Sequence, residues 1–200
     1  MKRVAKGSFG YIESSRKRAI VRTVVAIAVC VIIFLIGFIR FHSNKNGFSI
    51  IAALGCLPAG LSAVNMVMYL RATPCSKKAY DKIEAHRKGL LIRYDLEMTS
   101  YEQNFAIAAA TVLDKNVCCY TEKKDMDLLD CEKHIRNQIA QSGYASYTVK
   151  VFNDLDAFCK RLDQLEEIRS RNNIDPQAIE DAWVPGTVET CALVLLSISL

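Results

Sequence analysis

Two apolar runs lie close together near the N-terminus, separated by the polar residues 40–47. Residues 19–39 and 48–70 each approach the length of about 20 residues at which an apolar helix crosses a bilayer core. The pattern predicts a transmembrane helical hairpin over residues 19–70. Two alternatives are a pair of buried core helices and a cleaved signal peptide. A second apolar run follows the first at once, with no small-residue cleavage site between them, which favours the hairpin.

Lysine and arginine residues gather on the outer flanks of the two runs. Residues 1–18 and 71–89 are both basic, whereas the connecting stretch holds only Arg40 and Lys45. By the positive-inside rule, this asymmetry predicts a multi-pass protein of the cell membrane with both termini in the cytoplasm. We interpret residues 1–18 as a mobile basic arm and residues 71–89 as a basic juxtamembrane helix. Both are expected to bind anionic lipid headgroups, at about 1 kcal/mol per basic residue.

Small residues recur at helical spacing along the second run. Close approach of helix backbones in lipid depends on such residues. The stripe therefore predicts that the two helices of the hairpin pack together, and the alternative is a homo-oligomer that forms through the hairpin. The helix-packing residues are Ala52, Gly55, Ala59, Ser62 and Ala63.

From Leu90 onward, apolar and polar positions follow the pattern of a small folded domain. We predict a β-α-β-α-β-α-α-β order over residues 90–200, which implies crossover connections and a mostly parallel sheet covered by helices. The predicted strands are 90–98, 117–120, 147–152 and the apolar C-terminal run 187–200. The predicted helices are 100–113, 127–141, one capped by Asn153, and a short one opened by Asp175 and Pro176.

Charge separates this domain from the membrane-proximal part. The net charge of +5 is the sum of a strongly basic N-terminal portion and an acidic domain over residues 90–200. Nucleic-acid surfaces require clustered lysine and arginine, so no nucleic-acid partner is expected. The basic residues 71–89 are instead expected to adhere to an anionic bilayer, and the acidic domain is expected to be repelled from it.

Glycine and cysteine usage excludes several kinds of site. From residue 89 onward, glycine occurs only at Gly89, Gly143 and Gly186. This rules out the glycine-rich loops that cradle nucleotide phosphates. The chain has eight cysteines but no C-x-x-C pair, so neither a zinc ribbon nor a redox pair is indicated. We therefore expect no cofactor and no metal ion.

Carboxylates are the remaining candidates for chemistry. Asp95 and Glu97 lie on one side of the first predicted strand, and Glu122 and Lys124 form an E-x-K triplet after the second. Together they resemble the catalytic residues of metal-dependent nucleases of the restriction-endonuclease type, which implies metal-assisted hydrolysis. In that family the acid and the E-x-K triplet lie on strands joined as a hairpin, whereas here a helix is predicted between them.

The ends of the other predicted strands offer positions for ligand binding. Asp125 follows one strand, and Asn153 and Asp154 follow another. Ligands of parallel α/β sheets bind at the carboxyl ends of the strands, so these side chains are candidates for a ligand site.

No catalytic constellation accompanies the predicted anchor. The sequence favours a membrane-anchored regulatory or interaction module that is not an enzyme and that binds an unknown cytosolic protein or small ligand. One alternative is a membrane-tethered, metal-dependent hydrolase or nuclease-like enzyme that uses the strand-end carboxylates. A second is an oligomerising membrane effector that acts through the hairpin.

Overall fold

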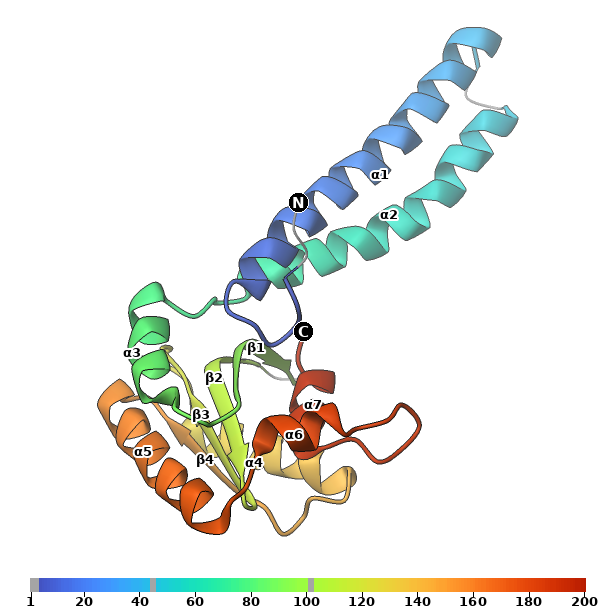
Figure 1. Ribbon diagram of the computed structural model, residues 1–200. Coiled ribbons are helices and arrows are strands. Elements are labelled where there is room, and N and C mark those ends of the chain that lie inside the picture. The colour runs from blue at the N-terminus through green and yellow to red at the C-terminus, as the bar shows by residue number, and fades with distance from the viewer. Residues whose placement is uncertain (1–3, 44–45, 101–102) are drawn as a thin grey trace. The chain divides into compact units, whose positions relative to one another are not determined.

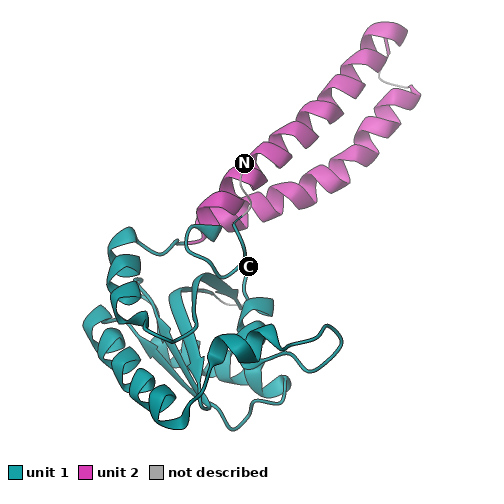
Figure 2. Cartoon of the chain, viewed as in Figure 1, with its two compact units in different colours: residues 1–11, 73–200 teal, residues 12–72 magenta. Residues whose placement is uncertain are grey.

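The computed structural model describes residues 4–43, 46–100 and 103–200, and these residues form two compact units (Figure 2). One unit is residues 12–72, and the other combines residues 1–11 with residues 73–200. Some predicted features lie outside the described residues: Lys2 and Arg3 of the basic arm, Lys45 of the connecting loop, and positions 101–102 of the predicted helix 100–113.

The first unit is a pair of long apolar helices, α1 (Tyr11–Phe41) and α2 (Gly47–Arg71) (Figure 1). The Asn46 side chain caps α2 by accepting a 2.9 Å hydrogen bond from the Ser49 amide. Ala52, Ala59 and Ser62 are buried, whereas Gly55 and Ala63 are half-buried. On α1 the buried positions are also mostly small, and they recur at similar spacing: Ile12, Ser15, Ala19, Thr23 and Gly37.

The remaining surface of these two helices is apolar and exposed. Val24, Leu57 and Leu61 are 58%, 70% and 71% exposed, and similar side chains line both helices. Both helices are long and apolar enough to cross a membrane. Helices in the core of a soluble protein bury such side chains, and these helices do not.

The second unit holds a four-stranded sheet in the order β1-β2-β3-β4. Its strands are β1 (Ile92–Thr99), β2 (Asn104–Leu113), β3 (Asn116–Tyr120) and β4 (Thr148–Phe152). The pairs β1–β2 and β2–β3 are antiparallel, and only β3–β4 is parallel. The domain is α/β as predicted, but its sheet is mixed, so the prediction of a mostly parallel sheet is wrong.

The error comes from β2, which occupies the region predicted as helix 100–113. Nearly every residue of β2 is buried, because the strand lies inside the sheet with side chains covered on both faces. A strand buried on both faces loses the alternation that marks a half-exposed strand, and its alanine run 108–110 has high intrinsic helix propensity. Asp114 and Lys115 both have positive φ and form the tight turn that joins β2 to β3.

Helices cover both faces of the sheet (Figure 1). On one face α4 (Leu128–Gln141) and α7 (Cys191–Ser197) share a core with Leu96, Ile107 and Val117. On the other face α3 (Lys77–Arg87) and α5 (Leu155–Asn172) pack over Tyr94, Ala108 and Cys118. A short helix, α6 (Pro176–Asp181), follows α5. The compact unit therefore includes α3, which lies in the stretch predicted to be a juxtamembrane helix.

The C-terminal run is not the central strand that its apolar sequence predicts. Thr190 caps α7 by accepting a 3.2 Å hydrogen bond from the Leu193 amide. Within α7, Cys191, Val194 and Leu195 are buried, at the spacing of one helical face. The pairing of this run with the sheet is a single bridge between Ser199 and Met98.

Gly7 and Leu200, far apart in the sequence, both contact the backbone of β1. The Tyr94 amide donates a 2.8 Å hydrogen bond to the Gly7 carbonyl, and the Leu200 amide donates a 2.7 Å bond to the Glu97 carbonyl. The Phe9 ring stacks on Tyr80 with 4.1 Å between centroids. These contacts cover part of an edge strand that would otherwise present unpaired backbone groups. They also fix residues 7–9, within the predicted mobile arm, to the domain.

Candidate functional site

Three of the predicted candidate carboxylates converge on residues 73–76, the short segment between α2 and α3; we call this arrangement the linker cradle. Asp95 Oδ1 accepts a 2.8 Å hydrogen bond from the Cys75 amide. Glu122 Oε2 accepts a 2.9 Å bond from the Ser76 amide. The Glu97 carboxylate lies 3.5 Å from the Thr73 amide. The structure thus brings Asp95, Glu97 and Glu122 to one segment, whose role the sequence did not reveal.

Asp95 lies on β1 and is 2% exposed. Its φ of 56° lies in the left-handed region, which aspartate and asparagine adopt more readily than most residues do. In the β1–β2 register, Asp95 lies between the Tyr94–Ala109 pair and the Leu96–Ile107 pair. The local distortion of β1 therefore accompanies a carboxylate that binds the linker.

Glu97 is the second buried carboxylate of β1, at 4% exposure. Burial raises its pKa, because the charged form is poorly solvated there, while the Thr73 amide and the charge of Lys123 partly oppose this shift. Glu97 is thus a carboxylate of reduced acidity that faces a backbone donor.

Glu122 follows β3 and binds Ser76 twice. Besides the amide contact, its Oε1 accepts a 2.6 Å hydrogen bond from Ser76 Oγ. Ser76 is also the N-cap of α3, where its Oγ accepts a 3.2 Å bond from the Ala79 amide. Glu122 therefore holds the residue at which α3 begins.

The cradle is built to bind N–H groups. Ionised carboxylates are strong hydrogen-bond acceptors, and the amides of the linker supply the donors. Within the described residues, no group of three or more histidine, cysteine, aspartate or glutamate side chains is arranged to hold a metal ion. Burial and the nearby charges of Glu122 and Asp95 raise the pKa of the Cys75 thiol to about 12, so this thiol stays protonated at neutral pH.

The other predicted residues are exposed. Lys124 and Asp125 are exposed in the turn after β3. Asn153 and Asp154 are exposed after β4, and Asp154, not Asn153, caps α5 by accepting a 3.0 Å hydrogen bond from the Asp156 amide. For Asp154 this contact provides a structural role at a helix terminus.

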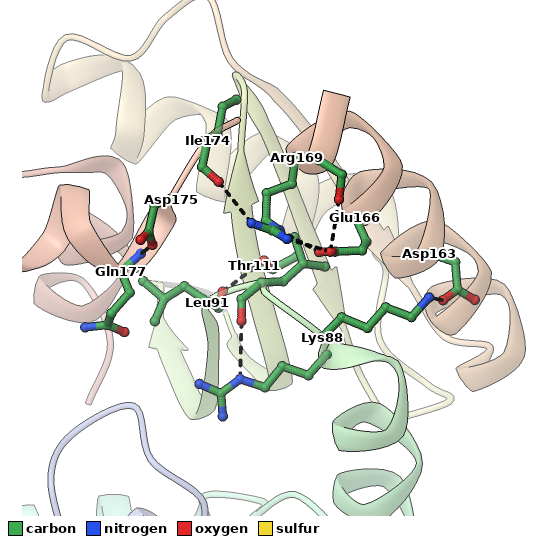
Figure 3. A network of polar contacts seen from close by, with 12 residues as sticks. Lys88, Leu91, Thr111, Asp163, Glu166, Arg169, Ile174, Asp175 and Gln177 are labelled. Atoms are coloured by element: carbon green, nitrogen blue, oxygen red, sulfur yellow. Dashed lines mark hydrogen bonds and ion pairs between the residues drawn. The ribbon is translucent and has the colours of Figure 1, made fainter. Parts of the chain in front are cut away.

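A separate polar network joins α5 to the connection between α3 and β1 (Figure 3). Arg169 binds the Glu166 carboxylate through two nitrogens, each at 2.8 Å, and donates a 3.3 Å bond to the Ile174 carbonyl. A side-chain carbon added at Gly89 would lie 2.5 Å from the Arg169 guanidinium. Gly89 is therefore the residue that allows the guanidinium to lie against this connection.

Three buried thiols lie in the core between the sheet and the helices α4 and α7. They are Cys119 of β3, Cys131 of α4 and Cys191 of α7, and each is at most 4% exposed. Burial raises the pKa of Cys131 and of Cys191 to about 12, and raises that of Cys119 well above its ordinary value. These side chains behave as small apolar groups and not as nucleophiles.

A cavity of about 180 Å³ lies where β2 ends beside α6 and the start of α7. Its walls are largely apolar and include Leu113, Ile179 and Tyr144, while Glu180 supplies a carboxylate. Glu180 is paired with Arg93 at 3.1 Å and also accepts a hydrogen bond from Thr190. No sequence pattern predicts this cavity, because its lining comes from distant segments that only the fold brings together.

Comparison with protein-family models, with curated proteins and with solved structures found no significant match.

Proposed function

We propose that the chain is a two-span membrane protein whose domain is a cytosolic interaction or regulatory module. The observation that carries this proposal is the exposed apolar surface of α1 and α2. At about 25 cal/mol per Å², leaving such a surface in water is costly, whereas lipid removes the cost. Both termini are placed in the cytoplasm, because the basic residues lie outside the hairpin loop.

The domain is proposed to act by binding, with a cytosolic protein or a small ligand as its partner. The best-placed carboxylates, Asp95 and Glu122, accept hydrogen bonds from the linker, and this contact favours attachment over catalysis. The cavity beside Glu180 is smaller than the range of about 300–1,000 Å³ that is typical of ligand pockets, so it supports only a very small, mainly apolar ligand. Anionic lipid headgroups at the basic flanks and a second copy through the hairpin are the further proposed partners.

Alkaline carbonate washing of membranes that contain the full chain tests the anchor. The chain should stay in the membrane pellet, whereas a peripheral protein is released. Thermal shift of the detergent-solubilised chain with a library of small apolar ligands tests the module. A stabilising ligand should lose its effect in Ile179→Trp, which fills the cavity, and should keep it in Leu129→Trp, an exposed control. Release by carbonate would contradict the anchor, and equal shifts in both variants would contradict the cavity.

A metal-dependent activity is the second candidate, and the convergence of Asp95, Glu97 and Glu122 on one segment is the observation that favours it. For such an activity these carboxylates would have to release the amides of residues 73–76 and bind a metal cation instead. Lys124 is near Glu122 in the sequence. Calorimetric titration of the full chain with Mg²⁺ or Mn²⁺ tests this candidate. A heat of binding that wild type shows and Glu122→Ala lacks supports the metal-dependent activity. Absence of a heat of binding in wild type contradicts it.

A further inference from the structure

A groove of about 610 Å³ runs between α1 and α2, within the hairpin unit. Its walls are mainly apolar, and Val29, Ile33, Ile51 and Leu61 contribute to them. Gly55 lies in the lining, where an added Cβ would come 2.9 Å from Cys30 Sγ. The volume falls in the range of about 300–1,000 Å³ that is typical of small-molecule sites.

One end of the groove is polar. Arg22 and Asn65 both line it and are exposed, and Ser62 lies between them. Arg22 Nε lies 3.3 Å from Ser62 Oγ, a hydroxyl that also pairs with Thr23 Oγ1 at 2.8 Å. This contact holds the guanidinium through Nε beside the polar residues of the groove. Guanidinium groups bind phosphate oxygens through paired N–H donors.

The position of Arg22 along the helix matches the depth of lipid phosphates. At 1.5 Å per residue, the stretch from Arg22 to Phe41 spans about 28 Å, close to the hydrocarbon thickness of a bilayer of about 30 Å. Between these two residues α1 carries no charged side chain other than Arg40, at the far end. Arg22 therefore falls at one boundary of the hydrocarbon core. The excess of basic residues places this boundary on the cytoplasmic side, where anionic lipids concentrate.

We propose that the groove holds one acyl chain of an anionic phospholipid whose phosphate is bound by Arg22 and Asn65. This inference rests on the proposed membrane insertion and adds a specific lipid site to it. The charge of Arg22 selects the anionic lipid, and the apolar walls take its chain. A lipid that merely surrounds the hairpin would show no such selectivity.

Native mass spectrometry of the detergent-purified full chain tests the site. The probes are phosphatidylglycerol and phosphatidylcholine with identical acyl chains, supplied in equal amounts. We expect one phosphatidylglycerol to be retained in preference to phosphatidylcholine. Arg22→Gln should weaken this retention about tenfold, which corresponds to one charge-assisted hydrogen bond. Arg40→Gln is the matched control, because Arg40 carries the same charge at the other end of α1 and does not line the groove.

A second variant tests the groove without altering charge. Gly55→Leu introduces a bulky side chain into the lining of the groove, against Cys30, and should abolish retention. Gly60→Leu, on the same helix, extends into open space and should leave retention unchanged. Equal retention of both lipids, or retention that survives Arg22→Gln, would overturn the site. A dimer that Gly55→Leu disrupts would assign the groove to a second copy instead and would also overturn it.

The outcomes separate this inference from the proposed insertion. If the hairpin does not span a membrane, carbonate releases the chain from membranes and neither lipid is retained. If only the site is wrong, the chain resists carbonate but retains the two lipids alike.

Discussion

The backbone amide of Cys75 lies 2.8 Å from Asp95 Oδ1, in a buried hydrogen bond that ties the start of the domain to β1. The segment that contains Cys75 follows α2 directly, with only Ala72 between Arg71 and Thr73. Asp95, Glu97 and Glu122 face three of the backbone N–H groups in this segment. Attachment of the linker is therefore a function of the carboxylates that the sequence singles out as catalytic candidates.

Removing the Asp95 acceptor should destabilise the domain. Asp95→Ala leaves the buried Cys75 amide without its acceptor and places alanine at φ 56°, so the free energy of unfolding should fall by about 1–3 kcal/mol or more. Asp95→Asn keeps an oxygen acceptor and tolerates the same φ, so its loss should be smaller. Urea unfolding of the full chain in detergent, followed by the single tryptophan, Trp183, measures both variants. Equal losses in the two would contradict the role of the acceptor.

Loosening Glu122 should expose the linker to protease. Glu122→Ala removes both hydrogen bonds to Ser76, so trypsin should cut more rapidly after Lys77 and Lys78, at the start of α3. Timed digestion with mass analysis of the fragments measures the rate. Asp125→Ala, in the adjacent exposed turn, is the control and should leave the cleavage rate unchanged. Identical rates in wild type and Glu122→Ala would show that Glu122 does not hold the linker.

The Arg169–Glu166 pair should make stability depend on pH. Hydrogen bonding by Arg169 lowers the pKa of Glu166 in the folded domain. The pair therefore contributes stability above the unfolded pKa of about 4.3, and this contribution is lost as the pH falls through the lower folded value. Urea midpoints measured from pH 6 to pH 3 should decline less steeply in Glu166→Gln than in wild type. Glu167→Gln, at the exposed neighbouring residue, is the control and should show the same pH dependence as wild type. The same dependence of the urea midpoint on pH in all three proteins would contradict the contribution of the Arg169–Glu166 pair.

The core thiols should resist alkylation while the domain is folded. Cys119, Cys131 and Cys191 are buried, and their raised pKa values leave almost no thiolate at pH 8. Peptide mass analysis after brief treatment with iodoacetamide should find all three unmodified, and the same treatment in 6 M guanidinium should modify them. Rapid modification of the folded protein would contradict the packing around α4 and α7.

Local patterns were enough to predict the paired apolar helices and much of the α/β domain. The stripe of Leu128, Cys131, Ile135 and Ile139 predicts α4, because one buried face imposes helical periodicity. The same reasoning fails for Asn104–Leu113. Burial on both faces removes the alternation of apolar and polar residues that marks a strand, and the helix propensity of its alanines then favours the wrong prediction of a helix. The C-terminal run fails for a related reason: it is so apolar that the 3.6-residue spacing of Cys191, Val194 and Leu195 is obscured.

The candidate site shows where sequence reasoning ends. The sequence singles out Asp95, Glu97 and Glu122 as catalytic candidates, and in the structure all three face backbone amides of residues 73–76. Their partners are backbone amides, which carry no sequence signature. The contact of Gly7 with Tyr94 is hidden for the same reason, because it joins two backbone groups far apart in the chain.

Cysteine labelling across sealed vesicles tests the central claim most directly. Ser43→Cys marks the hairpin loop and Lys150→Cys marks the exposed side of β4. If lipid surrounds α1 and α2, a membrane-impermeant maleimide should label only one of these two variants, and should reach the other after detergent opens the vesicles. Labelling of both variants in intact vesicles would place the loop and the domain on the same side and contradict the two-span account.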